Sequence, residues 1–73
     1  MATRAVPAAE STLRILRLLS RRGALGGAAI ARELELPRSS VYELLAALRE
    51  HGFVVHLPEE RRYALGLGAF EIG

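Results

Sequence analysis

Several residue types are missing from this chain of 73 residues, and each absence narrows its possible class. Without cysteine, the chain can form neither a disulfide framework nor a thiolate metal site, which is typical of a reducing, cytoplasmic setting. No stretch approaches the roughly 18 apolar residues of a membrane span, and the N-terminus lacks the apolar core of a secretory signal. We therefore expect one small soluble domain with no membrane partner.

Lysine, aspartate, asparagine and glutamine are missing as well, so the basic side chains are all arginine and the acidic ones all glutamate. The net charge of +2 is unevenly divided along the chain. Residues 1–38 hold seven arginines and three glutamates, whereas residues 39–73 hold three arginines and five glutamates. This asymmetry weakly favours a polyanionic partner, but the small total argues against tight binding by charge alone.

Residues 28–48 carry the clearest structural signal. Ile30 and Leu34 lie on one face of a first helix at i, i+4. The next helix repeats apolar residues at i, i+3, i+4 and i+7, namely Val41, Leu44, Leu45 and Leu48. Pro37 ends the first helix, because its ring and missing N–H break the hydrogen-bond ladder, but it fits the first turn of the second. Two such helices predict a helix-turn-helix unit, whose second helix enters the DNA major groove.

The N-terminal part should supply a third helix. We predict a flexible arm at residues 1–8 and an amphipathic helix at residues 9–21, ended by a left-handed Gly23. Glu10 and Arg14 form an i, i+4 pair in this helix. Its apolar arc covers more than half the circumference, which is wider than one core needs. Either the surplus forms a dimer contact, or a small domain wraps the helix on two sides.

The C-terminal part predicts a wing. After a recognition helix at residues 38–51 ended by Gly52, β-branched and aromatic residues flank a four-residue loop and indicate a β-hairpin. Because side chains alternate along a strand, one face should cover the core, carrying Phe53, Val55, Leu57, Tyr63 and Leu65. Residues 67–73 are too few to assign, although their apolar residues permit the start of a last helix.

Helix, helix-turn-helix and hairpin in this order make a mainly α winged helix-turn-helix fold, with a three-helix core and a two-stranded wing. The order and the local sequence resemble the N-terminal DNA-binding domain of IclR-type bacterial transcriptional regulators over nearly the whole chain. The resembling stretches are L-R-I-L-R-L-L (13–19), I-A-R-E-L-E-L-P-R-S-S-V-Y-E-L-L-A-A-L (30–48), H-G-F-V (51–54) and R-Y-A-L-G (62–66).

The resemblance implies a domain at residues 9–66 and, at residues 67–73, the start of a linker helix. That helix would lead to the family's larger C-terminal domain, which senses small-molecule effectors and is absent here, so we expect a fragment rather than a reduced natural protein. Two positions depart from the family. Glu35 stands where such turns usually have a left-handed glycine, at a cost on the order of 1 kcal/mol, and predicts a slightly remodelled turn. Glu43 stands where the family favours a basic residue.

The first turn of the recognition helix holds the main candidates for DNA contact. Arg38 can offer a bidentate fork to guanine O6 and N7 or clamp a phosphate. Ser39 and Ser40 can donate to phosphates or, alternatively, cap the helix. Tyr42 can bond a phosphate or lie on a thymine methyl, or it is a half-buried flank residue. Glu43 would repel phosphates, but it can accept from cytosine N4; otherwise it is solvated.

Outside that helix, arginines provide the remaining candidates. Arg61 and Arg62 lie at the wing tip, where a winged helix touches the flanking backbone or minor groove, although two glutamates precede them. Because strands alternate, we expect one of the two to point at DNA. Arg32 can reach the DNA backbone, with a solvated helix face as the alternative reading.

These observations predict sequence-specific binding of double-stranded DNA by a bacterial transcriptional regulator, as a homodimer on a partly palindromic operator. The competing hypothesis is a winged-helix module that docks on another protein and never meets DNA. His51 and His56 have no cysteine or aspartate to complete a metal set, and no serine has a local histidine to activate it. We therefore expect neither a metal, nor another cofactor, nor catalysis.

Overall fold

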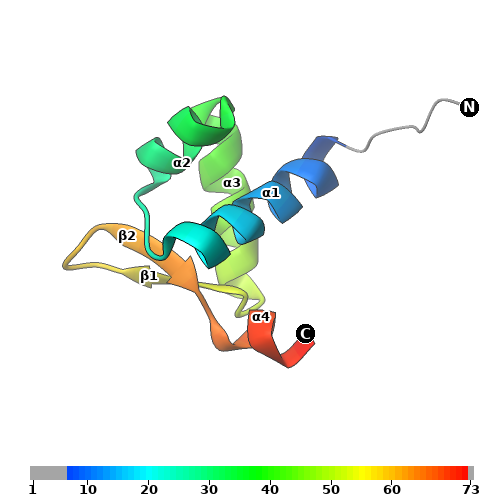
Figure 1. Ribbon diagram of the computed structural model, residues 1–73, viewed down its shortest axis with the longest axis vertical. Helices are drawn as coiled ribbons and strands as arrows, with labels where there is room; N and C mark the ends of the chain where they lie inside the picture. Colours follow the sequence, from blue (N-terminus) through cyan, green and yellow to red (C-terminus); the bar gives the residue numbers. More distant parts are fainter. Residues whose placement is uncertain (1–6, 73) are drawn as a thin grey trace, which may run out of the picture.

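The computed structural model describes residues 7–72, so residues 1–6 of the predicted arm lie outside it. These described residues form four helices and two strands: α1 (Pro7–Arg22), α2 (Gly27–Leu34), α3 (Arg38–Glu50), β1 (Val54–Leu57), β2 (Arg62–Leu65) and α4 (Leu67–Ile72). The antiparallel hairpin of β1 and β2 projects away from the N-terminal end of α1 (Figure 1). This is the predicted winged helix-turn-helix fold.

One core joins the first three helices to the hairpin. The apolar spacing predicted from the sequence is confirmed, because Ile30, Val41 and Leu45 have no exposed surface. Leu44 is only half-buried at the edge. The ten buried apolar residues are Ile15, Leu18, Leu19, Ile30, Ala31, Leu34, Val41, Leu45, Leu48 and Val54. No helix among residues 7–72 is long and apolar enough to cross a membrane.

The turn between α2 and α3 depends on a strained residue. Glu35 adopts the left-handed conformation, with φ 56° and ψ 46°. Its N–H donates to the carbonyl of Arg32 at 3.3 Å, and the N–H of Leu36 donates to that of Ala31 at 2.9 Å. This pair of bonds is a Schellman motif. The predicted remodelling is therefore wrong: the backbone keeps its left-handed geometry and accepts the cost of a Cβ there.

The helix boundaries largely follow the predicted glycines. Gly23 and Gly52 both have φ 79°, after α1 and α3 respectively. Two limits differ from the prediction. α1 begins at Pro7, inside the stretch assigned to the arm, because proline is favoured in the first helical turn. Pro37 is the N-cap of α3 rather than part of its first turn, with an extended ψ of 141°.

Arg14 does not make the predicted pair with Glu10. Its guanidinium instead donates to the carbonyl of Leu34, the last residue of α2, at 3.0 Å. A helix C-terminus leaves such carbonyls without intrahelical partners, and a cation suits the negative end of the helix dipole. Arg14 therefore links α1 to the start of the turn. The ion pair found within residues 7–72 joins Arg22 to Glu33 instead.

The face of β1 differs from the prediction by one residue. Val54 is 1% exposed and packs in the core, whereas Val55 is 41% exposed. The reason is that Phe53 still belongs to the end of α3, since its N–H donates to the carbonyl of Leu48 at 2.9 Å. The strand thus starts one residue later than its alternation suggested. The face of β2 is confirmed: Tyr63 and Leu65 are among the apolar residues that pack against the core.

The residues after β2 form the short helix α4. Gly66 donates its N–H to the carbonyl of Phe53 at 2.7 Å, and Gly68 donates to that of Gly52 at 2.9 Å. A Cβ on Gly66 would lie 2.5 Å from the carbonyl oxygen of Gly52, which is too close for any side chain. The G-L-G sequence thus allows the backbone after the wing to pack directly on the end of α3.

The strained turn predicts a stabilising substitution. Glu35→Gly should raise the free energy of unfolding by about 0.5 to 1 kcal/mol, because glycine carries no Cβ penalty in the left-handed region. Urea denaturation followed by circular dichroism measures the change. The control is Ala46→Gly on the exposed face of α3, which should lower the free energy of unfolding by about 1 kcal/mol. Equal destabilisation by both would contradict the role assigned to position 35.

Candidate nucleic-acid interface

The first turn of α3 presents an unusual number of free donors. Arg38 and Ser39 are exposed and Ser40 is half-buried. The first intrahelical bond of α3 is made by Val41, whose N–H donates to the carbonyl of Pro37 at 3.1 Å, so the three preceding N–H groups have no helical acceptor. α3 has no side-chain capping bond at its N-terminus. The serines thus do not cap the helix, and their hydroxyls stay available beside its positive end.

Tyr42 lies on the flank of α3, as one of its two sequence-based readings proposed. It is 44% exposed, and the inner part of its ring packs over Gly27 at the start of α2. A Cβ on Gly27 would lie 2.6 Å from the ring. The ring also meets Tyr63 of β2 edge-on, with centroids 6.5 Å apart and planes at 66°. Tyr42 therefore connects the recognition helix both to α2 and to the wing while keeping an exposed edge.

The wing is fixed at a second point by the loop before α2. Leu25 and Tyr63 exchange two backbone hydrogen bonds, from Leu25 N–H at 2.9 Å and from Tyr63 N–H at 2.7 Å. His56 stacks obliquely on Tyr63, with ring centroids 4.7 Å apart. Residues 7–72 contain no group of three potential metal ligands. The structure thus places His56 in an aromatic contact, and sequence reasoning missed the pairing of Leu25 because no local pattern marks it.

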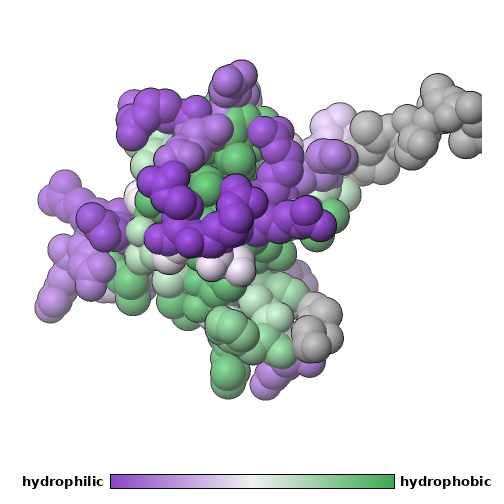
Figure 2. Space-filling model, in the orientation of Figure 1, coloured by the Kyte–Doolittle hydropathy of each residue, from purple (hydrophilic) through white to green (hydrophobic). Residues whose placement is uncertain are grey.

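The tip of the wing carries both arginines that the sequence singled out. Arg61 is in the turn with a left-handed φ of 56°, and its N–H donates to the carbonyl of Pro58 at 3.3 Å. Arg62 opens β2 opposite Leu57. This pairing places Arg62 on the sheet face away from Tyr63 and the core. Both side chains are exposed, and Figure 2 shows hydrophilic side chains gathered at the tip, where two glutamates precede them.

Glu43 and Arg32 complete the candidate set. Glu43 is exposed, yet it borders a hollow of about 380 Å³ between the start of α1 and the turn, which Ser40 and Pro37 also line. No ion pair holds it within the described residues. Arg32 is exposed in the last turn of α2. Side-chain contacts thus connect α3 to the wing through Tyr42, whereas no side-chain hydrogen bond within residues 7–72 connects Arg32 to either of them.

A helix with a donor-rich first turn, braced against an arginine-tipped wing, defines a winged helix-turn-helix DNA-binding domain. Comparison with known families gives the same result at higher resolution. The model of the IclR helix-turn-helix domain matches residues 8–58. The chain belongs to this family, and its fold and class are those of a DNA-binding transcription regulator domain, a family defined by DNA binding rather than by catalysis.

Solved structures support the same assignment. An IclR transcriptional regulator from Alicyclobacillus acidocaldarius matches with a TM-score of 0.89 and 30% identity, over 94% of this chain and 28% of that one. An IclR family regulator from Brucella abortus matches with a TM-score of 0.86 and 27% identity, over 96% of this chain and 27% of the other. The chain thus spans just over a quarter of the length of these regulators.

A third similar structure comes from outside the regulators. The Zalpha domain of PKZ from Carassius auratus, solved in complex with Z-DNA, matches with a TM-score of 0.75. Its identity is 23%, over 82% of this chain and 98% of the domain, and this likeness concerns the fold alone. A search of curated proteins gives no significant match.

The contact between Tyr42 and α2 can be tested by adding one methyl group. Gly27→Ala should push the Tyr42 ring outward, because the new Cβ would overlap it and the ring is the movable end of a side chain. The aromatic NMR signals of Tyr42 and Tyr63 should shift together, since each ring lies in the field of the other. The control is Gly26→Ala, whose Cβ would lie 3.4 Å from its nearest neighbour, the carbonyl oxygen of Arg61. Unchanged tyrosine signals in Gly27→Ala would contradict the packing.

Proposed function

We propose that this domain binds double-stranded DNA sequence-specifically, in the bacterial cytoplasm, as a homodimer on a partly palindromic operator. The observation that carries the proposal is the exposed first turn of α3, where three unpaired N–H groups, two free hydroxyls and a guanidinium lie together. Donors of this kind suit phosphate oxygens and guanine edges. A dimer would place two such helices in successive major grooves, about one helical turn apart.

Each candidate residue has a role in this proposal. Arg38 contacts a guanine edge or a phosphate, and Ser39 and Ser40 donate to phosphates. Arg61 or Arg62 reaches the DNA flanking the groove, as the wings of such domains do. The exposed edge of Tyr42 faces DNA while its inner part stays on α2.

Arg32 is a weaker candidate for the DNA backbone, because no contact ties it to the wing or to the first turn of α3. An effector would act through a further domain of the kind that the longer regulators have room for. The competing proposal, a protein-docking module, uses the same exposed face but predicts no salt-dependent affinity for DNA.

Arginine at the start of α3 is the first test. Arg38→Ala should weaken binding to mixed-sequence duplexes at low salt by about tenfold or more, since a bidentate or phosphate contact of arginine contributes about 1–3 kcal/mol. Fluorescence anisotropy measures the affinity as a function of salt. The control is Arg49→Ala, which removes an exposed arginine from the other end of α3. If the first variant binds like the wild type, or the wild type shows no salt-dependent binding, the DNA proposal fails.

The duplex panel in this experiment includes a left-handed Z-form duplex beside the right-handed ones, because one structural neighbour was solved with Z-DNA. Preferential binding to right-handed DNA is expected from the recognition helix of a transcription regulator. A preference for the left-handed duplex would replace the operator proposal with recognition of DNA shape.

Glu43 gives a separate test of how α3 faces DNA. Glu43→Gln should strengthen binding to all duplexes severalfold, because it removes a carboxylate that repels phosphates and has no ion-pair partner within residues 7–72. Anisotropy against duplexes that differ only in their cytosine positions makes the comparison. Weaker binding confined to cytosine-containing sites would show instead that the carboxylate accepts from cytosine N4.

A further inference from the structure

The outward face of α1 is apolar where no element of the domain covers it. Leu13 is 60% exposed and points away from the buried side of the helix, which carries Ile15, Leu18 and Leu19. The sequence left two explanations for this wide apolar arc. The structure excludes the first, in which the domain wraps the helix on two sides, because none of the described elements packs over Leu13.

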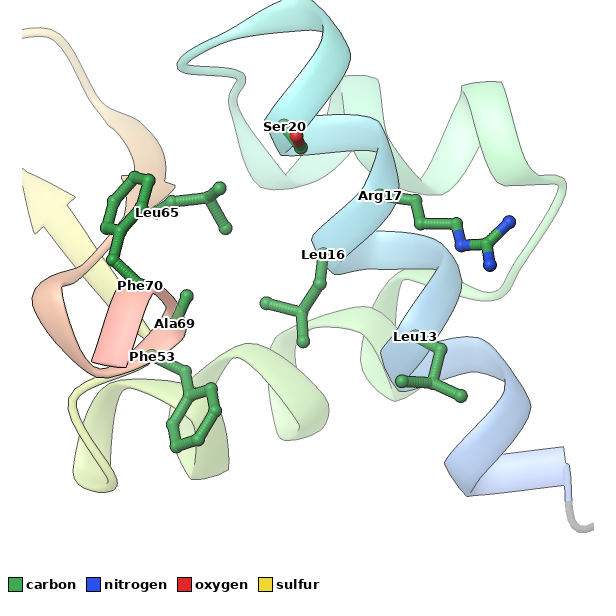
Figure 3. A pocket seen from close by; sticks show the side chains of 8 residues that line it. All are labelled: Leu13, Leu16, Arg17, Ser20, Phe53, Leu65, Ala69 and Phe70. Carbon is green, nitrogen blue, oxygen red and sulfur yellow. The ribbon is translucent and has the colours of Figure 1, made fainter. Parts of the chain in front are cut away.

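The exposed leucine borders an open groove. The groove has a volume of about 420 Å³ and runs between α1 on one side and the end of β2 and α4 on the other (Figure 3). Its lining is mostly apolar and includes Leu13, Leu16, Leu65 and Phe70, the last of which is 65% exposed. Figure 2 shows hydrophobic side chains gathered over the part of the surface around α4. None of the lining residues belongs to α3, so an occupied groove leaves the first turn of α3 free.

Two opposite charges flank the exposed leucine along the same face. Glu10 lies one turn before Leu13 and Arg17 one turn after it, and these three residues border one surface depression. Neither charge has an ion-pair partner within residues 7–72, because Arg14, the natural partner of Glu10, is bonded to Leu34. Seven residues of helix separate the two charges by about 10 Å along the axis. The face is therefore negative at one end, apolar in the middle and positive at the other end.

We propose that this face binds a second copy of the same chain, with the two α1 helices antiparallel across a two-fold axis. An isologous interface requires that residue i of one copy meet residue j of the other and the reverse. The stripe of Glu10, Leu13 and Arg17 meets this requirement, because turning it end to end places Glu10 against Arg17 twice. The two Leu13 side chains then meet near the axis, and the apolar groove receives the neighbouring helix.

This inference rests on the proposed function, since it gives the homodimer its interface. An apolar small molecule would fill the groove without using the two charges at its rim. A partner with a different sequence would need no self-complementary arrangement. The end-to-end symmetry of the stripe thus favours a second copy over other occupants.

Charge reversal tests the interface directly with the 73-residue chain. Sedimentation equilibrium without DNA should show reversible dimers, and Glu10→Arg or Arg17→Glu alone should weaken dimerisation by about tenfold, because each variant places like charges together twice. An equimolar mixture of the two variants should recover the wild-type constant within about twofold, since every cross-copy pair is again opposite in sign. The double variant Glu10→Arg, Arg17→Glu should recover it as well.

A monomeric wild type at millimolar concentration, or a mixture that stays as weak as its components, would overturn the interface. Leu13→Ser provides an independent check, because it should abolish dimerisation while circular dichroism shows unchanged helix content. Binding to a half-site duplex separates the two proposals. Salt-dependent binding by a chain that never dimerises retains the DNA function and rejects this interface, whereas dimers that recover on mixing but never bind DNA retain the interface and reject the function.

Discussion

The burial of α2 and α3 against α1 is the constraint on which the rest of the structure depends. α2 has eight residues and α3 has thirteen, and isolated helices this short are marginal in water. They persist because Ile30, Val41 and Leu45 are fully buried in a core shared with α1. Fixing the buried face of α3 also fixes its opposite face, so the exposure of Arg38 and Ser39 is a consequence of packing rather than of local preference.

Two further contacts set the geometry between the helix-turn-helix and the wing. The left-handed Glu35 reverses the chain within a few residues, and Arg14 ties the end of α2 back to α1. On the other side, the backbone pairing of Leu25 with Tyr63 holds the wing beside α2, and the Tyr42 ring bridges α3 to β2. The first turn of α3 and the arginines of the wing are thus positioned by separate contacts that share one core.

Sequence reasoning succeeded where a short-range pattern determines structure and failed where a distant partner does. The spacing of Val41, Leu45 and Leu48 predicted the buried face of α3, and the two helix-ending glycines were recognisable by their positions. The face of β1 was misassigned because Phe53 bonds backwards to α3, and the pair of Glu10 with Arg14 fails because Arg14 reaches a carbonyl twenty residues away. For the site, the sequence predicted which residues are exposed, but the absence of capping by the serines and the packing of Tyr42 on Gly27 required the fold.

The account assigns different work to two faces of one small domain: DNA contact to the first turn of α3 and the wing, and self-association to the outer face of α1. A titration of the isotopically labelled chain with a duplex, followed by amide NMR at low and raised salt, tests this division most directly. The account predicts that signals of residues 38–42 and 59–62 shift most and recover as salt is added. Shifts centred on the outer face of α1, or shifts that do not respond to salt, would contradict it.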